Sequence, residues 1–84
     1  MQQQIIKHYG YKNQLHKLVE ELQELEDVII NEPANEDHLQ EEMADVINLL
    51  EQIIEHKNWF DSVNLIKAFK IHRQIKRIER SKQC

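Results

Sequence analysis

The fold is decided by residues 12–30, which read KNQLHKLVEELQELEDVII. Apolar side chains recur in this stretch every three or four residues, at Leu15, Leu18, Val19, Leu22, Leu25 and Ile29. Because an α-helix turns about 100° per residue, these side chains cover an arc of roughly 120° on one side of a helix. The pattern predicts an amphipathic helix from about Lys12 to Ile30.

A second helix with the same kind of pattern follows a short break. Pro33 lies between Asn31 and Asn35, and these residue types end helices and favour turns. The second helix is expected from about Asn35 or Glu36 to His56. Its apolar face comprises Leu39, Met43, Val46, Ile47, Leu49, Leu50, Ile53 and Ile54. Because the link is short, the two helices are expected to form an antiparallel hairpin.

A third helix is expected toward the C-terminus. Residues 57–60 have the character of a connection, and Asp61 or Ser62 can cap a helix that runs to about Arg80. Ahead of the first helix, the two isoleucines at 5–6 are expected in a short turn. The predicted fold class is therefore all-α, an antiparallel helical hairpin plus a C-terminal helix that assembles into a helical bundle across subunits.

The composition limits what the chain can be. One glycine and one proline in 84 residues exclude turn-rich β folds and Gly-rich phosphate loops. We expect one domain over residues 1–84 whose core, at 40% hydrophobic and 31% charged residues, is small enough to need a partner subunit. The single cysteine, Cys84, excludes an intramolecular disulfide. Since no apolar run approaches about 18 residues and no signal-peptide pattern is present, we expect a cytoplasmic protein without a membrane partner.

Charge is divided sharply along the chain. Residues 1–19 carry three lysines and no acid, whereas residues 20–55 carry thirteen acids and no lysine or arginine. Residues 56–84 carry eight bases against two acids. The acidic middle contains no lysine or arginine of its own with which its acids could form stabilising pairs along a helix. It must be neutralised by a metal ion or by basic segments of this chain or of a neighbour.

Carboxylates meet where the first two helices are expected to face each other. Glu21 lies at the margin of the first apolar arc, and Glu24, one turn later, lies further out. Glu42 falls inside the second apolar arc, with Asp45 one turn later. Four carboxylates from two helices form an all-oxygen site that favours Mg²⁺ or Mn²⁺ over zinc or copper. None of the five histidines follows a glutamate by three residues, which excludes a di-iron bundle. The alternative is that these acids are solvated like their neighbours.

The same acids form two motifs, EELQE at residues 20–24 and EMAD at residues 42–45, with seventeen residues between Glu24 and Glu42. An EExxE on one helix followed by an ExxD on the next resembles the MazG-like family. This family belongs to the all-α nucleoside triphosphate pyrophosphohydrolases, which have the dimeric dUTPases as relatives. The resemblance covers residues 9–57, which we take as the core motif region.

The resemblance implies a Mg²⁺-dependent enzyme, with Mn²⁺ as a substitute, that converts a nucleoside triphosphate to the monophosphate and pyrophosphate in nucleotide house-cleaning. Glu21, Glu24, Glu42 and Asp45 would match the metal ligands of the family, and Glu21 or Glu24 would also be the catalytic carboxylate. Asn48 would face the nucleotide. Members of the family assemble as homo-dimers or homo-tetramers.

A basic stripe lies in the expected C-terminal helix, residues 61–80. Lys70, Arg73, Arg77 and Arg80 are spaced so that they share one side of the helix. Members of the family carry phosphate-binding basic residues after the second motif, so the resemblance points to Lys70 and Arg73 as substrate-binding residues. The alternatives are a solvated face or docking on acids of a neighbouring subunit. The net charge of −4 and the few aromatic residues argue against a nucleic-acid partner.

Two other functions stay open on the sequence. A non-catalytic oligomerisation or interaction module would use the helical hairpin for assembly and the basic helix for a partner. A catalytically degenerate relative would bind metal and nucleotide without turnover.

Overall fold

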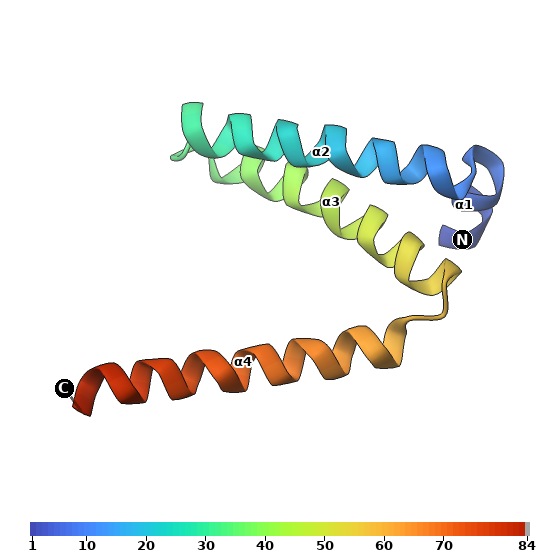
Figure 1. Ribbon diagram of the computed structural model, residues 1–84. Coiled ribbons are helices and arrows are strands. Elements are labelled where there is room, and N and C mark those ends of the chain that lie inside the picture. The colour runs from blue at the N-terminus through green and yellow to red at the C-terminus, as the bar shows by residue number, and fades with distance from the viewer. Residues whose placement is uncertain (84) are drawn as a thin grey trace.

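The computed structural model describes residues 1–83, and over these residues it is all-helical, without strands (Figure 1). Helix α1 spans Gln2–Tyr9, α2 spans Tyr11–Asn31, α3 spans Glu36–His56 and α4 spans Phe60–Gln83. The prediction of an all-α fold is confirmed.

The N-terminal segment differs from the prediction. Instead of a short turn at residues 5–6, the chain forms the eight-residue helix α1, which packs against α2 and α3. Ile6 is the most buried side chain of the core, at 1% exposure. The packing of α1 on the two longer helices, with Ile6 buried, stabilises a helix that would be too short to persist alone.

Helices α2 and α3 lie side by side and run antiparallel (Figure 1). The turn between them occupies residues 32–35 and contains Pro33. The backbone N–H of Glu32 donates to the carbonyl of Val28 at 2.8 Å, which closes the last turn of α2. At the start of α3 the Oδ1 atom of Asn35 accepts from the backbone N–H of His38 at 3.2 Å and caps the helix.

The core between α2 and α3 is narrower than the apolar pattern suggests. On α2 the buried side chains are Gln14, Glu21 and Val28, one residue before the predicted positions 15, 22 and 29. The prediction of which α2 side chains form the core is therefore partly wrong. The apolar arc of α2 is broad enough for two contacts, and α3 covers only one edge of it, so Leu15, Leu22 and Ile29 stay exposed.

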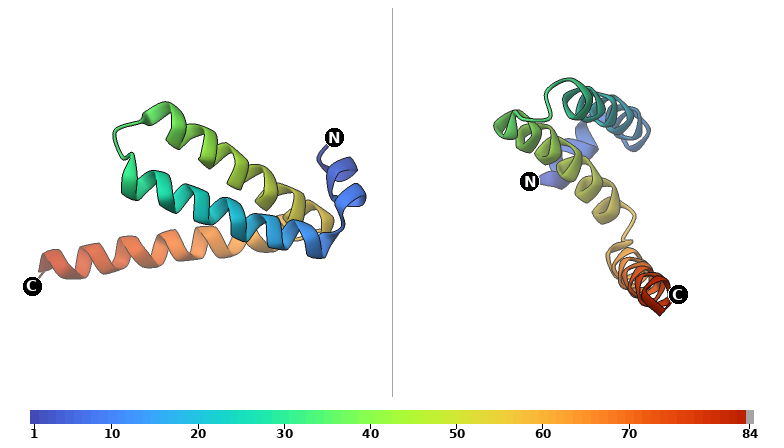
Figure 2. Two further views of the ribbon diagram at one scale, coloured as in Figure 1. Left: turned by 90° about the horizontal axis from the view of Figure 1, so that it is seen from above. Right: turned by 90° about the vertical axis from the view of Figure 1, so that its left-hand side faces the viewer.

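Helix α4 stands apart from the rest of the molecule (Figure 2). Among the described residues it contacts α3 but neither α1 nor α2. The radius of gyration is 16.4 Å, whereas a compact domain of this length has about 12 Å. The chain is thus an antiparallel pair of helices with a short helix on one end and a long helix extending away from it.

The link between α3 and α4, residues 57–59, is held by several contacts. Asn58 has a positive φ of 57°, and the backbone N–H of Trp59 donates to the carbonyl of Ile54 at 2.9 Å. The ammonium of Lys57 lies 4.5 Å from the ring centroid of Tyr11, at the start of α2. These contacts set the direction in which α4 leaves α3.

Within the described part of the chain, none of the helices is both long and apolar enough to cross a membrane.

Candidate functional site

Three glutamates meet halfway along the α2–α3 pair. Glu21 and Glu24 come from adjacent turns of α2, and Glu42 comes from α3. Each offers one carboxylate oxygen, and these three oxygens lie within 4.8 Å of one another. Three carboxylates at this separation repel each other unless a proton or a cation lies between them.

The burial of this cluster distinguishes it from the other acids. Glu21 is only 7% exposed, in a position where a helix pair normally buries an apolar side chain. The Oε2 atoms of Glu21 and Glu42 are both buried without a hydrogen-bond partner. A buried carboxylate oxygen without a partner costs free energy that a bound cation would recover.

The charge state of Glu21 reflects this environment. Burial raises the pKa of its carboxyl group above the ordinary value of 4.5, and the neighbouring carboxylates of Glu24 and Asp45 raise it further. The ammonium of Lys17 acts in the opposite direction, at 3.4 Å from Oε1 of Glu21. This lysine is also 3.5 Å from Glu20, and its hydrogen bonds to Glu21 and Glu20 raise the pKa of Lys17.

Glu42 has an outer partner that the sequence did not reveal. The Nε2 atom of His38 lies 3.5 Å from Oε1 of Glu42, and its Nδ1 atom lies 3.1 Å from Oε2 of Glu32. The imidazole therefore joins the turn between α2 and α3 to Glu42 of the cluster. The sequence feature that could have indicated this contact is the spacing of four residues between His38 and Glu42, which places both on one face of a helix.

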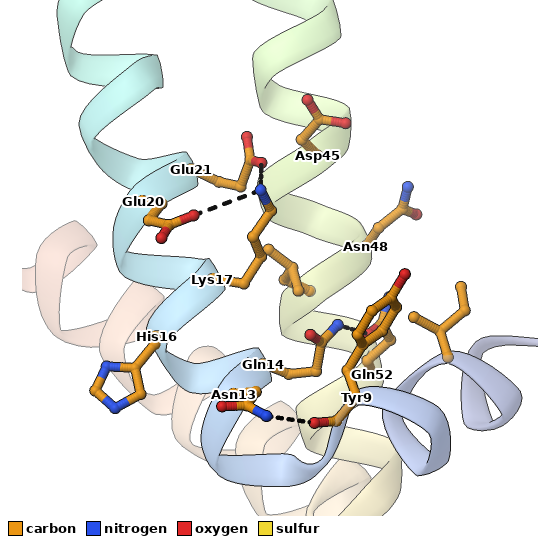
Figure 3. A pocket seen from close by; sticks show the side chains of 12 residues that line it. Tyr9, Asn13, Gln14, His16, Lys17, Glu20, Glu21, Asp45, Asn48 and Gln52 are labelled. Carbon is orange, nitrogen blue, oxygen red and sulfur yellow. Dashed lines mark hydrogen bonds and ion pairs between the residues drawn. The ribbon is translucent and has the colours of Figure 1, made fainter.

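A pocket of about 630 Å³ opens next to the cluster, between α2, α3 and the end of α1 (Figure 3). Tyr9 from α1, Lys17 and Glu21 from α2, and Asn48 from α3 line it. Its inner part contains a buried hydrogen bond from Nε2 of Gln14 to Oε1 of Gln52, 2.8 Å long. Apolar, amide and charged groups thus meet in one cavity, as they do in ligand pockets.

The remaining predicted site residues fall into two groups. Asp45 and Asn48 line the pocket (Figure 3). Asp45 is exposed there and lies outside the three-oxygen cluster. Lys70 and Arg73 are on α4, which contacts neither α2 nor α1 within one chain. The structure therefore brings the acidic residues and Asn48 to one place, but not the two basic residues.

The donor set suits a hard divalent cation. Carboxylate oxygens without nitrogen or sulfur donors are the ligands that Mg²⁺ and Mn²⁺ prefer. The exposed Glu24 and the open pocket leave room for water or a substrate oxygen beside the buried Oε2 atoms of Glu21 and Glu42. A scan against protein-family models, a search of curated proteins and a search of solved structures each gave no significant match.

Proposed function

We propose that this protein is a Mg²⁺-dependent nucleoside triphosphate pyrophosphohydrolase of the MazG-like type, which releases a monophosphate and pyrophosphate. The main support is the pair of buried, unpartnered carboxylate oxygens on Glu21 and Glu42, with Glu24 beside them. This arrangement is destabilising in the absence of a cation. An adjoining pocket provides space for a ligand. The EExxE and ExxD motifs of the sequence supply the reaction type.

Each side chain has its own task in this proposal. Glu21, Glu24 and Glu42 would hold Mg²⁺, with Asp45 at the edge of the pocket, and the ion would neutralise phosphate charge and make water more acidic. Glu21 or Glu24 would orient the attacking water and accept its proton. Asn48 would offer its amide to the nucleotide.

The basic residues need a second chain to take part. Lys70 and Arg73 lie on α4, away from the pocket of their own chain, so their role in binding phosphate depends on the assembly. The same proposal therefore includes a homo-dimer or homo-tetramer in which the helical bundle is completed across subunits.

The decisive experiment is a nucleotide panel with and without Mg²⁺ that separates pyrophosphate release from phosphate release. We expect Mg²⁺-dependent pyrophosphate release by the wild type and at least about a 100-fold loss in Glu42→Gln, because the amide removes a charge from the site. Mg²⁺ should also raise the melting temperature of the wild type and not that of the variant.

The matched control is Glu55→Gln. This exposed glutamate lies on the same helix, about 20 Å from Glu42 along its axis, and makes the same change of charge. It should keep wild-type turnover, and far-UV circular dichroism should show equal helix content in all three proteins. Full activity of Glu42→Gln would remove the proposed site.

One observation favours the alternative of a non-catalytic interaction module. Most of the apolar side chains of α4 are exposed, including Leu65, Ile66 and Phe69. Absence of turnover on the whole panel, together with no Mg²⁺-induced rise in melting temperature, would favour this alternative. A Mg²⁺-induced rise without turnover would indicate a degenerate nucleotide-binding relative.

A further inference from the structure

The α2–α3 pair has an apolar side that nothing covers within the chain. On α2 this side comprises Leu15, Val19, Leu22 and Ile29, and on α3 it comprises Met43, Ile47 and Leu50, all 37–53% exposed. On each of the two helices, every one of these residues directly follows, in the sequence, a residue that faces the other helix. Because the helices run antiparallel, a step of one residue turns both stripes toward the same side of the pair. We call this surface the apolar face.

The opposite side of the pair is polar and holds the pocket. Asn13 and Lys17 on α2, and Asp45 and Asn48 on α3, precede the inward-facing positions by one residue and line the pocket. The apolar face and the pocket therefore lie on opposite sides of the α2–α3 pair. A partner bound to the apolar face leaves the glutamate cluster and the pocket accessible. In such a dimer Lys70 and Arg73 lie away from the pocket, so phosphate binding by them would need a further pair of chains, as in a homo-tetramer.

Helix α4 carries a matching stripe. Ile71, Ile75 and Ile78 recur at four and three residues, so they share one side of the helix. All three are about half exposed. Lys67 and Lys82 continue this stripe at its two ends, and their long stems extend the apolar surface while their charges stay at its ends.

The amount of exposed surface indicates that a large interface is missing. The chain exposes 7020 Å², whereas a compact monomer of this size exposes about 5300 Å². The excess of about 1700 Å² per chain corresponds to about 3400 Å² in a dimer, which lies within the range of permanent interfaces, about 2000–5000 Å².

The distribution of charge along the chain indicates which part of a second chain covers the apolar face. Residues 20–55 carry thirteen acids and no lysine or arginine, so two apolar faces packed on each other would bring like charges together. Helix α4 has seven lysine and arginine residues against two acids. Lys67 and Lys82 lie on the side of the isoleucine stripe, whereas Arg73, Arg77 and Arg80 lie on the other side of the helix. A basic α4 on this face would also bring positive charge near Glu26, which lies between Leu22 and Ile29.

The chain's own α4 is held away from this position. The Trp59 to Ile54 hydrogen bond and the Lys57 contact with Tyr11 fix the link between α3 and α4. Closure within one chain would require different backbone angles in this link, whereas binding to a second chain leaves the link as it is.

We propose that α4 of a second copy of this chain covers the apolar face, in a reciprocal dimer in which each chain gives its α4 to the other. This inference rests on the assembly included in the proposed function and deepens it, but it does not depend on the metal site or on catalysis. It specifies which surfaces of the chain meet and which element supplies each of them.

Sedimentation velocity on the full chain tests the proposal. The wild type should be dimeric at micromolar concentration. The α4 variant Ile71→Glu/Ile75→Glu and the apolar-face variant Leu22→Lys/Ile47→Lys should each raise the dimer dissociation constant at least about 100-fold. Since all four side chains are already exposed within one chain, helix content should stay unchanged by circular dichroism. If either double variant loses helix, the single variant Ile75→Glu tests the same interface from the side of α4.

Two further samples test whether the isoleucine side of α4, and not another surface of the second chain, covers the apolar face. Leu65→Glu/Phe69→Glu makes the same change on the other side of α4 and should change the dissociation constant less than about threefold. Mixing the α4 variant with the apolar-face variant should restore a dimer, because one intact pairing of α4 with the apolar face remains available. A monomeric wild type, or an α4 variant that stays dimeric, would overturn the proposal.

Discussion

Glu21 is an ionisable side chain at a helix–helix interface, and its stability cost should depend on pH. Its folded-state pKa is raised above 4.5, so the charged form opposes folding. The penalty is fully present above the folded pKa and disappears as pH falls toward 4.5. In EDTA we expect Glu21→Gln to melt higher than the wild type at pH 7.5, with a gap that narrows at pH 5. Thermal melts at both pH values measure this gap.

Glu20→Gln is the control for this prediction, because Glu20 is the adjacent exposed acid that also contacts Lys17. It should melt close to the wild type at both pH values. A gap for Glu21→Gln that widens as the pH falls would contradict the prediction. Saturating Mg²⁺ should reverse the order, since the ion stabilises only the chain that keeps the carboxylate.

The clustering of Glu21, Glu24 and Glu42 could be predicted from the sequence, because acids near or inside an apolar stripe break its pattern. His38 and the buried pair of Gln14 and Gln52 could not. Polar side chains that form hydrogen bonds inside an interface leave no mark on an apolar pattern, and only the pairing of the helices shows that they meet.

At the scale of the helices, this glutamine pair links the N-terminal end of α2 to the C-terminal end of α3. Both side chains are nearly buried, at 6% and 4% exposure. Gln14→Leu or Gln52→Leu alone should lower the free energy of unfolding by about 1–3 kcal/mol, because the remaining amide loses its partner. The double variant should lie within about 1 kcal/mol of the wild type, since no polar group is then left unpaired. Urea unfolding at one protein concentration measures all four proteins.

Additive losses in the double variant would show that the two glutamines do not depend on each other. Gln23→Leu provides the control for the gain of an apolar side chain, because Gln23 is exposed on the same helix. Its free energy of unfolding should stay within about 0.5 kcal/mol of the wild type.

The helices themselves were predictable to different extents. The start and end of α2 and α3 lie within about one residue of the predicted positions, because Pro33 and the asparagines mark the turn and the apolar pattern is long. Helix α1 was missed because tertiary contacts of Ile6, and not a repeated pattern, stabilise it. The direction of α4 depends on three linking residues, 57–59, and on backbone angles that no periodicity encodes.

At the scale of the whole molecule, so large an exposed surface ties stability to assembly. If dimerisation and folding are coupled, the melting temperature rises with protein concentration by mass action. A dimer of this length has an unfolding enthalpy of about 120 kcal/mol, which gives a rise of about 4 °C for each tenfold increase in concentration. Differential scanning calorimetry from 5 to 500 µM, roughly two decades, measures this slope. The Ile71→Glu/Ile75→Glu variant should melt lower and show no slope, whereas Leu65→Glu/Phe69→Glu should keep the slope. A wild-type melting temperature independent of concentration would mean that the separate α4 and the apolar face contribute nothing to stability through a second chain.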